Sequence, residues 1–315
     1  MFYWNGFWTW PGRERALHEM KDLVEGALLW VMGGVFQSLP RRASLYLGKM
    51  IGRFGYCLAS RRRILAIANL RMSLGGELKE EQIREIARAS FEFLGMNAAE
   101  FFKLPMLSST NIGRYTSVEG EENLIDALAM DKGVLSLSGH IGNWDMLSAG
   151  LALRGYPVSL ITKVSRSRAL NRIWTEYRRK AGIGLLMGRG TMKESLRHLR
   201  NKGIVGFAMD QNARRKEGVF VPFFGRDACT ITSLAVLARR TGAPVVPIYS
   251  YREGDIHRIV IEEPMRHDNL EDADTDILVK TRAYTEWIEK VVRRHPGQWT
   301  WLHDRWKTRP TDELT

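Results

Sequence analysis

The fold is indicated most directly by the stretch Val134-Leu135-Ser136-Leu137-Ser138-Gly139-His140-Ile141-Gly142-Asn143-Trp144-Asp145. A short apolar run, suited to a buried strand, leads into a glycine-containing turn and then into an amphipathic segment. Gly139 and Gly142 permit a tight turn in which the backbone approaches its neighbours closely. The stretch therefore predicts a strand, a loop that carries His140, and a helix whose first turn carries Asp145.

The same alternation of elements continues along the chain. Predicted strands, which are short and rich in apolar or β-branched residues, cover residues 134–138, 158–162, 204–209, 245–251 and 259–262. Predicted amphipathic helices cover residues 145–154, 169–181, 192–201, 232–241 and 275–295. Such alternation favours an α/β fold with a central, mostly parallel sheet flanked by helices. In folds of this class the chemistry lies beyond the carboxyl ends of the strands.

The first third of the chain follows a different pattern. Apolar residues recur at three-to-four spacing over residues 13–39, 42–58 and 79–102, which predicts three helices. Pro105 ends this region. We therefore expect a helical region over residues 1–105 and an α/β domain over residues 106–315.

The composition is that of a globular protein. Of 315 residues, 44% are hydrophobic and 26% are charged, which separates the chain from disordered proteins. Its two cysteines, Cys57 and Cys229, cannot form a disulfide framework, and no C-x2-C metal spacing is present. We expect a reducing environment, no metal, and a core role for Cys229 rather than a nucleophilic one.

The positive charge is concentrated near the N-terminus. The net charge is +12, and residues 41–76 contain eight basic residues and no acidic one. An uncharged apolar run over residues 26–40 precedes them, and the extreme N-terminus carries the aromatics Phe2, Tyr3, Trp4, Phe7, Trp8 and Trp10. A spanning helix needs roughly 20 apolar residues, so the run either spans with snorkelling ends or lies in the interface. We expect membrane association and no nucleic-acid binding.

His140 and Asp145 are candidates for a general base and its carboxylate partner. On one regular helix a separation of five would turn them apart, but they can meet if His140 lies in the loop before the helix. A carboxylate bonded to one imidazole nitrogen fixes the tautomer and raises the basicity of the other nitrogen. The spacing alone favours equally a buried structural histidine and an unrelated helix cap.

A second group of candidates follows the strand over residues 204–209. Asp210 and Gln211 stand at the end of that strand, where a carboxylate is poorly explained as core; a capping or turn role for Asp210 is the alternative. The run over residues 218–225 contains Phe220 and Phe223 and is too apolar for a surface loop. We interpret it as core or as the wall of a lipid-binding groove.

A third group is basic. Lys163 and Arg168 follow the strand over residues 158–162, and Asn171 and Arg178 stand seven residues apart, on one helical face. Basic side chains at a strand end suit phosphate groups of a carrier or of a glycolipid. A solvated basic face is the alternative.

These motifs together resemble the bacterial late acyltransferases of lipid A biosynthesis, within the lysophospholipid acyltransferase-like superfamily. The resemblance is carried by His140-x4-Asp145, Asp210-Gln211, the run over residues 218–225, and the ending over residues 301–307. It implies a glycerolipid-acyltransferase-like fold and transfer of a fatty acyl chain from acyl carrier protein or coenzyme A to a glycolipid hydroxyl. It also implies a place at the cytoplasmic face of the bacterial inner membrane and no cofactor.

The resemblance assigns roles to single residues as well. His140 matches the family's catalytic histidine and Asp145 its acidic partner, while Asp210 matches an acidic position that contacts the histidine in some relatives. Which of the two carboxylates orients His140 therefore stays open. Asn171 and Arg178 are a looser match. Glu, with Phe or Tyr after the histidine, is frequent in the family where this chain has Asp145 and Ile141, so the exact acceptor stays open as well.

The expected mechanism is direct transfer without an acyl-enzyme. No G-x-S-x-G sequence supplies a nucleophile. His140 would deprotonate the acceptor hydroxyl, and backbone N–H groups near Gly142 and Asn143, or a nearby arginine, would hold the oxyanion. Asn143, Gln211, Phe220 and Phe223 join the three basic residues and Asn171 as expected substrate contacts. We expect a monomer; the alternatives are another acceptor, such as a phosphatidylinositol mannoside or an aminolipid, and a non-catalytic lipid-binding protein.

Overall fold

A computed structural model describes residues 11–310 apart from 166, 189 and 267, with side chains from residue 20 onward. Its α-helices are α1 (Pro11–Ser38), α2 (Arg41–Leu58), α3 (Ser60–Leu74), α4 (Glu80–Lys103), α5 (Glu121–Ala129), α6 (Trp144–Ala152), α7 (Arg168–Lys180), α8 (Thr191–Arg200), α9 (Ser233–Thr241) and α10 (Ala273–Arg294). Its strands are β1 (Thr116–Glu119), β2 (Val134–Ser138), β3 (Val158–Thr162), β4 (Gly184–Met187), β5 (Ile204–Ala208), β6 (Gly218–Phe223), β7 (Arg226–Ile231), β8 (Val245–Glu253) and β9 (Ile256–Ile261).

The central sheet has seven strands in the order β1-β9-β8-β2-β5-β3-β4. All neighbouring strands are parallel except β8 and β9, which form an antiparallel pair. Parallel strands covered by helices on both faces are nearly continuous apolar runs, and Val134, Leu135 and Leu137 of β2 are fully buried. The expected α/β fold with a mostly parallel sheet is confirmed.

Several elements differ from the sequence-based prediction. The pattern did not identify β1 and β4, of four residues each, nor the helices α3 and α5. Nor did it identify the antiparallel hairpin that β6, within the run over residues 218–225, forms with β7. The hairpin turns at Phe224 and Gly225, which both have positive φ. Four-residue strands are too short for the periodicity of their side chains to distinguish them from loops.

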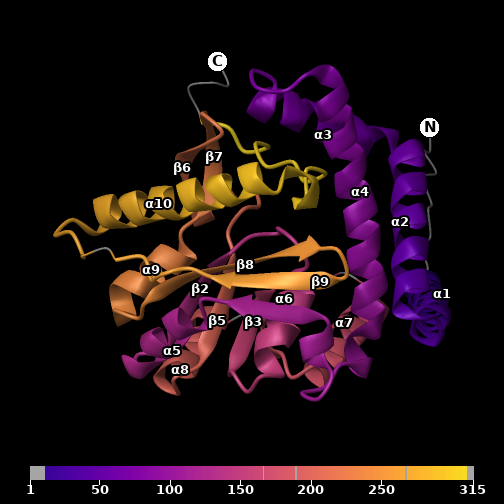
Figure 1. Cartoon of the computed structure of the whole chain (residues 1–315), viewed down its shortest axis with the longest axis horizontal. Coiled ribbons are helices and arrows are strands. Elements are labelled where there is room, and N and C mark those ends of the chain that lie inside the picture. The colour runs from indigo at the N-terminus through magenta and orange to yellow at the C-terminus, as the bar shows by residue number, and fades with distance from the viewer. Residues whose placement is uncertain (1–10, 166, 189, 267, 311–315) are drawn as a thin grey trace, which may run out of the picture.

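The N-terminal helices pack together beside the sheet. Figure 1 shows α1, α2 and α4 side by side at one edge of the molecule. The α2 and α4 backbones touch at glycines, since a Cβ added to Gly95 of α4 would lie 2.1 Å from the carbonyl oxygen of Gly48 in α2. A Cβ added to Gly52 would lie 2.2 Å from the carbonyl oxygen of Phe91. This close approach fixes α4, whose far side faces the sheet.

The exposed side of α1, α2 and α3 is apolar. Large hydrophobic side chains of these helices with at least two fifths of their surface exposed are Met20, Leu23, Val24, Leu28, Trp30, Val31, Val35, Tyr46, Ile51, Phe54, Leu58 and Ile64. No helix within residues 11–310, as far as the structure describes them, is both long and apolar enough to cross a membrane. The expected aromatic contribution of residues 2–10 lies outside the described residues.

Candidate active site

The predicted catalytic residues follow two neighbouring strands. Strands β2 and β5 pair in register, so that Ser138 lies beside Ala208 where both strands end. His140 therefore emerges next to Asp210, although the two residues are 70 positions apart. Gly139 makes this approach possible, because a Cβ added there would lie 3.2 Å from Cγ of Asp210.

His140 and Asp210 form a hydrogen-bonded pair. Nδ1 of His140 lies 2.8 Å from Oδ1 of Asp210, and the backbone N–H of His140 donates to Oδ2 at 2.7 Å. Trp299 donates its indole N–H to the same Oδ2 at 2.7 Å. The Asp210 side chain is 1% exposed and that of His140 is 24% exposed, so the imidazole is the member of the pair that substrate can reach.

The electrostatics of the pair favour an ionised carboxylate and a basic imidazole. Burial raises the pKa of Asp210, but the charge of His140 and the hydrogen bonds from His140 and Trp299 outweigh it and lower the pKa to about 2. Burial lowers the pKa of His140, yet the charge of Asp210 and its hydrogen bond outweigh burial and raise the pKa above its ordinary value. An anionic Asp210 holds the proton of neutral His140 on Nδ1, so that Nε2 is unprotonated and can act as a proton acceptor.

Asp145 does not contact the imidazole, so the hypothesis that it partners His140 is wrong. Its carboxylate accepts hydrogen bonds from Nε of Arg178 at 2.7 Å and from Nη2 at 3.3 Å. Both side chains are buried. Asp145 is the second residue of α6, and its side chain points to α7 rather than back along the loop. It acts on His140 only through its charge, which helps to raise the pKa of the imidazole.

This pairing also corrects the expected role of Arg178. Arg178 is 9% exposed, and its guanidinium neutralises Asp145 and lies over the ring of Trp174, 5.7 Å from the ring centroid. It is therefore not presented to a phosphate group. Asn171 likewise faces its own loop, accepting a hydrogen bond from the N–H of Ser165 at 2.7 Å and donating to the carbonyl of Ser165.

The remaining basic candidates are accessible. Lys163 is exposed and lies near enough to His140 for its charge to lower the pKa of the imidazole. Arg168 is exposed at the start of α7, and with Arg172 and Arg179 it lines an open hollow along that helix. A phosphate-binding role for Lys163 and Arg168 stays a prediction.

The aromatic candidates divide between surface and core. Phe223 is fully buried and stacks on Trp306 at 5.7 Å between ring centroids, so it belongs to the core and not to a groove wall. Phe220 is half-buried beneath the guanidinium of Arg215, 5.6 Å from its ring centroid. Of the two, only Phe220 remains a candidate contact for substrate.

Gln211 and Asn143 have different surroundings. Gln211 places its side-chain nitrogen 3.3 Å from Nε2 of His140, the atom that would take the proton. Asn143 is buried and caps α6, because its Oδ1 accepts the N–H groups of Asp145 and Met146, both at 3.1 Å. Its side chain is therefore committed to the protein, and its expected role as a substrate contact is not supported by this geometry.

The sequence does not indicate what the C-terminal segment over residues 299–305 contacts. In the structure this segment bonds to Asp210, Gln211 and Asn212. Besides the Trp299 bond, Nε2 of His303 accepts the N–H of Asn212 at 3.0 Å. Arg305, fully buried, donates to the carbonyl of Cys229 at 2.8 Å. The dense tryptophans of this segment were the available signal, but they did not indicate which loop they would meet.

Nor does the sequence single out Asn97 and Glu100, which approach the His140 loop from α4.

Within the described residues, no group of three or more His, Cys, Asp or Glu side chains is arranged to hold a metal ion. The arrangement thus offers a buried carboxylate, an imidazole with one accessible nitrogen, and a neighbouring amide.

Comparisons with known proteins agree on one class of enzyme. Residues 17–308 match the family model described as bacterial lipid A biosynthesis acyltransferase. The lipid A biosynthesis palmitoleoyltransferase of Escherichia coli (strain K12) is 27% identical over 288 residues, 90% of each chain. The lipid A biosynthesis lauroyltransferase of the same organism is 26% identical over 90% of this chain and 92% of its own. The phosphatidylinositol mannoside acyltransferase of Mycolicibacterium smegmatis is 25% identical over 73% of this chain and 75% of its own.

Proposed function

Since this chain belongs to the family of bacterial lipid A biosynthesis acyltransferases, and is an O-acyltransferase, we propose a specific donor, acceptor and base for its reaction. The enzyme transfers a fatty acyl chain from a thioester of acyl carrier protein or coenzyme A to a hydroxyl of a lipid A precursor. The observation that carries the proposal is the hydrogen bond between Asp210 and Nδ1 of His140, which leaves Nε2 as the base.

The transfer proceeds in one covalent exchange. Nε2 of His140 takes the proton of the acceptor hydroxyl while the hydroxyl oxygen attacks the thioester carbonyl. The attack forms the C–O bond of the ester and gives a tetrahedral intermediate, whose collapse breaks the C–S bond. The proton on His140 passes to the departing thiolate. Cys229 is not a nucleophile in this scheme, because it is buried and burial raises the pKa of its thiol.

One of the oxyanion donors expected from the sequence is already in use. The N–H of Gly142 donates to the carbonyl of Gln298 at 2.9 Å, so it is already bonded. The amide of Gln211, beside Nε2 of His140, is placed to turn toward the carbonyl oxygen of a bound thioester. The ammonium of Lys163 supplies positive charge at the same edge of the sheet.

The direct test is transfer by the purified protein. Thioesters of acyl carrier protein and of coenzyme A are offered with a lipid A precursor and, in parallel, with a phosphatidylinositol mannoside and an aminolipid. Mass spectrometry should show the gain of one acyl group on the lipid A precursor. If only one of the other lipids gained an acyl group, that lipid would replace the lipid A precursor as the proposed acceptor. No gain of an acyl group on any of them would contradict the proposed transfer.

The wild-type enzyme should lose activity as the pH falls. His140 must be neutral to accept a proton, so kcat/KM should decline as the pH drops through the pKa of His140, which is raised above its ordinary value by Asp210. Asp210 stays ionised throughout this range, because its pKa is about 2. A kcat/KM profile from about pH 5 to pH 9 measures the effect. A flat profile, or activity that rises toward low pH, would be incompatible with His140 as the base.

We further propose that the exposed apolar side of α1–α3 contacts the membrane at its cytoplasmic face. The support is its exposed hydrophobic side chains beside the basic residues 41–63. Fully burying one large apolar side chain contributes about 1.5–3 kcal/mol. Phe54→Glu/Leu58→Glu, which replaces two side chains that are 65% and 66% exposed, should therefore weaken binding to anionic vesicles about 100-fold.

A co-sedimentation assay measures this binding. The control is Ile125→Glu, since Ile125 of α5 is also an exposed hydrophobic residue, with 54% of its surface accessible, but lies outside α1–α3. Equal binding of the double variant and the wild type would refute the proposed surface, whereas equal weakening by the control would show that the effect is not local.

A further inference from the structure

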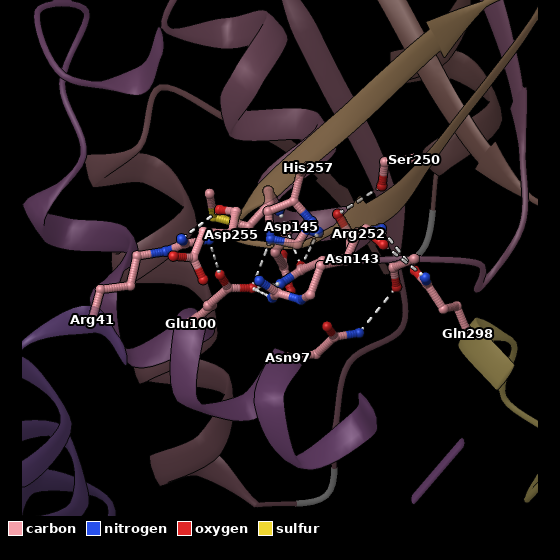
Figure 2. Close-up of polar contacts among 12 residues, drawn as sticks. Arg41, Asn97, Glu100, Asn143, Asp145, Ser250, Arg252, Asp255, His257 and Gln298 are labelled. Atoms are coloured by element: carbon pink, nitrogen blue, oxygen red, sulfur yellow. Dashed lines mark hydrogen bonds and ion pairs between the residues drawn. The ribbon is translucent and has the colours of Figure 1, made fainter. Parts of the chain in front are cut away.

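Helix α4 holds the loop that follows His140. Asn97 and Glu100 stand three residues apart on α4 and so share a face. Asn97 donates its side-chain N–H to the carbonyl of Gly142 at 3.0 Å, and Glu100 accepts the side-chain N–H of Asn143 at 2.8 Å. Both side chains are buried. Figure 2 shows them reaching the loop from the same helix.

Asn143 joins this contact to the next helix. One end of its amide donates to Glu100, and the other end accepts the first N–H groups of α6 from Asp145 and Met146. A single buried side chain thus connects α4 to the N-terminus of α6. Any shift of α4 relative to α6 would pull on the loop between His140 and Asp145.

Gly142 is held from three directions. Asn97 bonds its carbonyl, and its N–H donates to the carbonyl of Gln298 at 2.9 Å. Its φ is +62°, and a Cβ added to it would lie 1.8 Å from the carbonyl oxygen of Ser250. Only glycine fits this position without a clash. The backbone two residues after His140 is therefore held in one conformation.

The carboxylate of Glu100 is kept ionised by two arginines and the ring of His257. Arg41 donates to its Oε1 at 2.9 Å, while Arg252 and the ring of His257, 2.8 Å away, bond to its Oε2. Burial raises the pKa of Glu100, but His257, Arg252 and Arg41 together hold it far below its usual range. The acceptor for Asn143 is therefore a permanent charge, which strengthens the bond.

We propose that Asn97 and Glu100 are positioning residues, which hold Gly142 and Asn143 so that His140 faces Asp210 and the substrate. The inference rests on the proposed function for its kinetic consequence. These two residues need touch no substrate. A misplacement of about 1 Å can cost on the order of 100-fold in rate, so residues behind the site affect kcat through geometry alone.

The test distinguishes the bond between Asn143 and Glu100 from the cap that Asn143 also provides for α6. Asn143→Ser keeps a good N-cap for α6 but removes the N–H that reaches Glu100. We expect kcat to fall about 10–100-fold with KM for the thioester changed less than about 2-fold. Asn97→Leu, which removes the bond to Gly142 and keeps the bulk, should act in the same direction. The matched control is Asp272→Ser, which exchanges the cap of α10.

A second measurement needs no substrate and keeps the outcome independent of the reaction. Hydrogen exchange of the amides over residues 139–146 should become faster in Asn143→Ser and in Asn97→Leu, but not in Asp272→Ser. Unchanged exchange would overturn the inference. A fall in kcat without faster exchange would assign Asn143 to substrate contact and would also overturn it. If the wild type transfers no acyl group, the proposed function fails, and exchange still decides the inference.

Discussion

His140→Ala should lower kcat by about 10²–10⁴-fold, the usual cost of losing a general base. His140 is the member of the pair that substrate can reach, and the buried carboxylate of Asp210 holds its Nδ1. Alanine offers no lone pair that could take over the role of Nε2. The fold should persist, because the side chain is 24% exposed and lies in a loop at the end of β2. Steady-state transfer from the thioester to the lipid measures the effect.

The control for this change is His198→Ala. His198 lies on α8 and its Nε2 is 2.9 Å from the carbonyl oxygen of Pro157; it lies beside Gly203, just before β5 begins, whereas His140 follows the end of β2. Its replacement should leave kcat within about 2-fold, since it contributes no group to the reaction. Near-normal turnover of a folded His140→Ala protein would rule out the base mechanism.

Asp210→Asn should have the second-largest effect, about 10²–10⁴-fold in kcat. An amide in this position can donate to Nδ1, which would place the proton of His140 on Nε2 and remove the base. The variant should also lower the pKa of His140, because the charge of Asp210 and its hydrogen bond raise it in the wild type. The acidic limb of the residual kcat/KM profile should therefore move to lower pH.

Asp145→Asn provides the contrast. It leaves the bond between His140 and Asp210 in place but deprives buried Arg178 of its counter-charge, which typically costs about 3–5 kcal/mol of stability. We expect a lower melting temperature and a smaller loss of kcat than for Asp210→Asn. If Asp145→Asn were the more damaging to turnover while folded, Asp210 would not be the partner that matters.

The sequence predicted the apolar five-residue strands of the central sheet best. The prediction for residues 134–138 and 158–162 matches β2 and β3, because apolar residues cover both faces of these strands. It missed β1 and β4, whose four residues carry too little pattern. The division between helical and α/β regions at residue 105 stays a prediction.

At the site, the sequence identified the residue types but not which side chains meet. His140 and Asp210 come together only because β2 and β5 are neighbours in register, and strand order cannot be read from periodicity. Asp145 lies near His140 along the chain, yet it points to Arg178 on α7. The face of α4 that carries Asn97 and Glu100 reads as an ordinary helix with two polar residues.

Trp299 bonds to a carboxylate that precedes it by 89 positions, and His303 and Arg305 support the same loop. This arrangement has a consequence for biosynthesis. A ribosome delivers β2, β5 and the His140–Asp210 pair long before it delivers the segment that fixes Asp210. A nascent chain can therefore form its sheet early but acquires a completed site only when residues 299–305 have emerged and docked. Activity would then mark the end of folding and would not accumulate gradually as the chain grows.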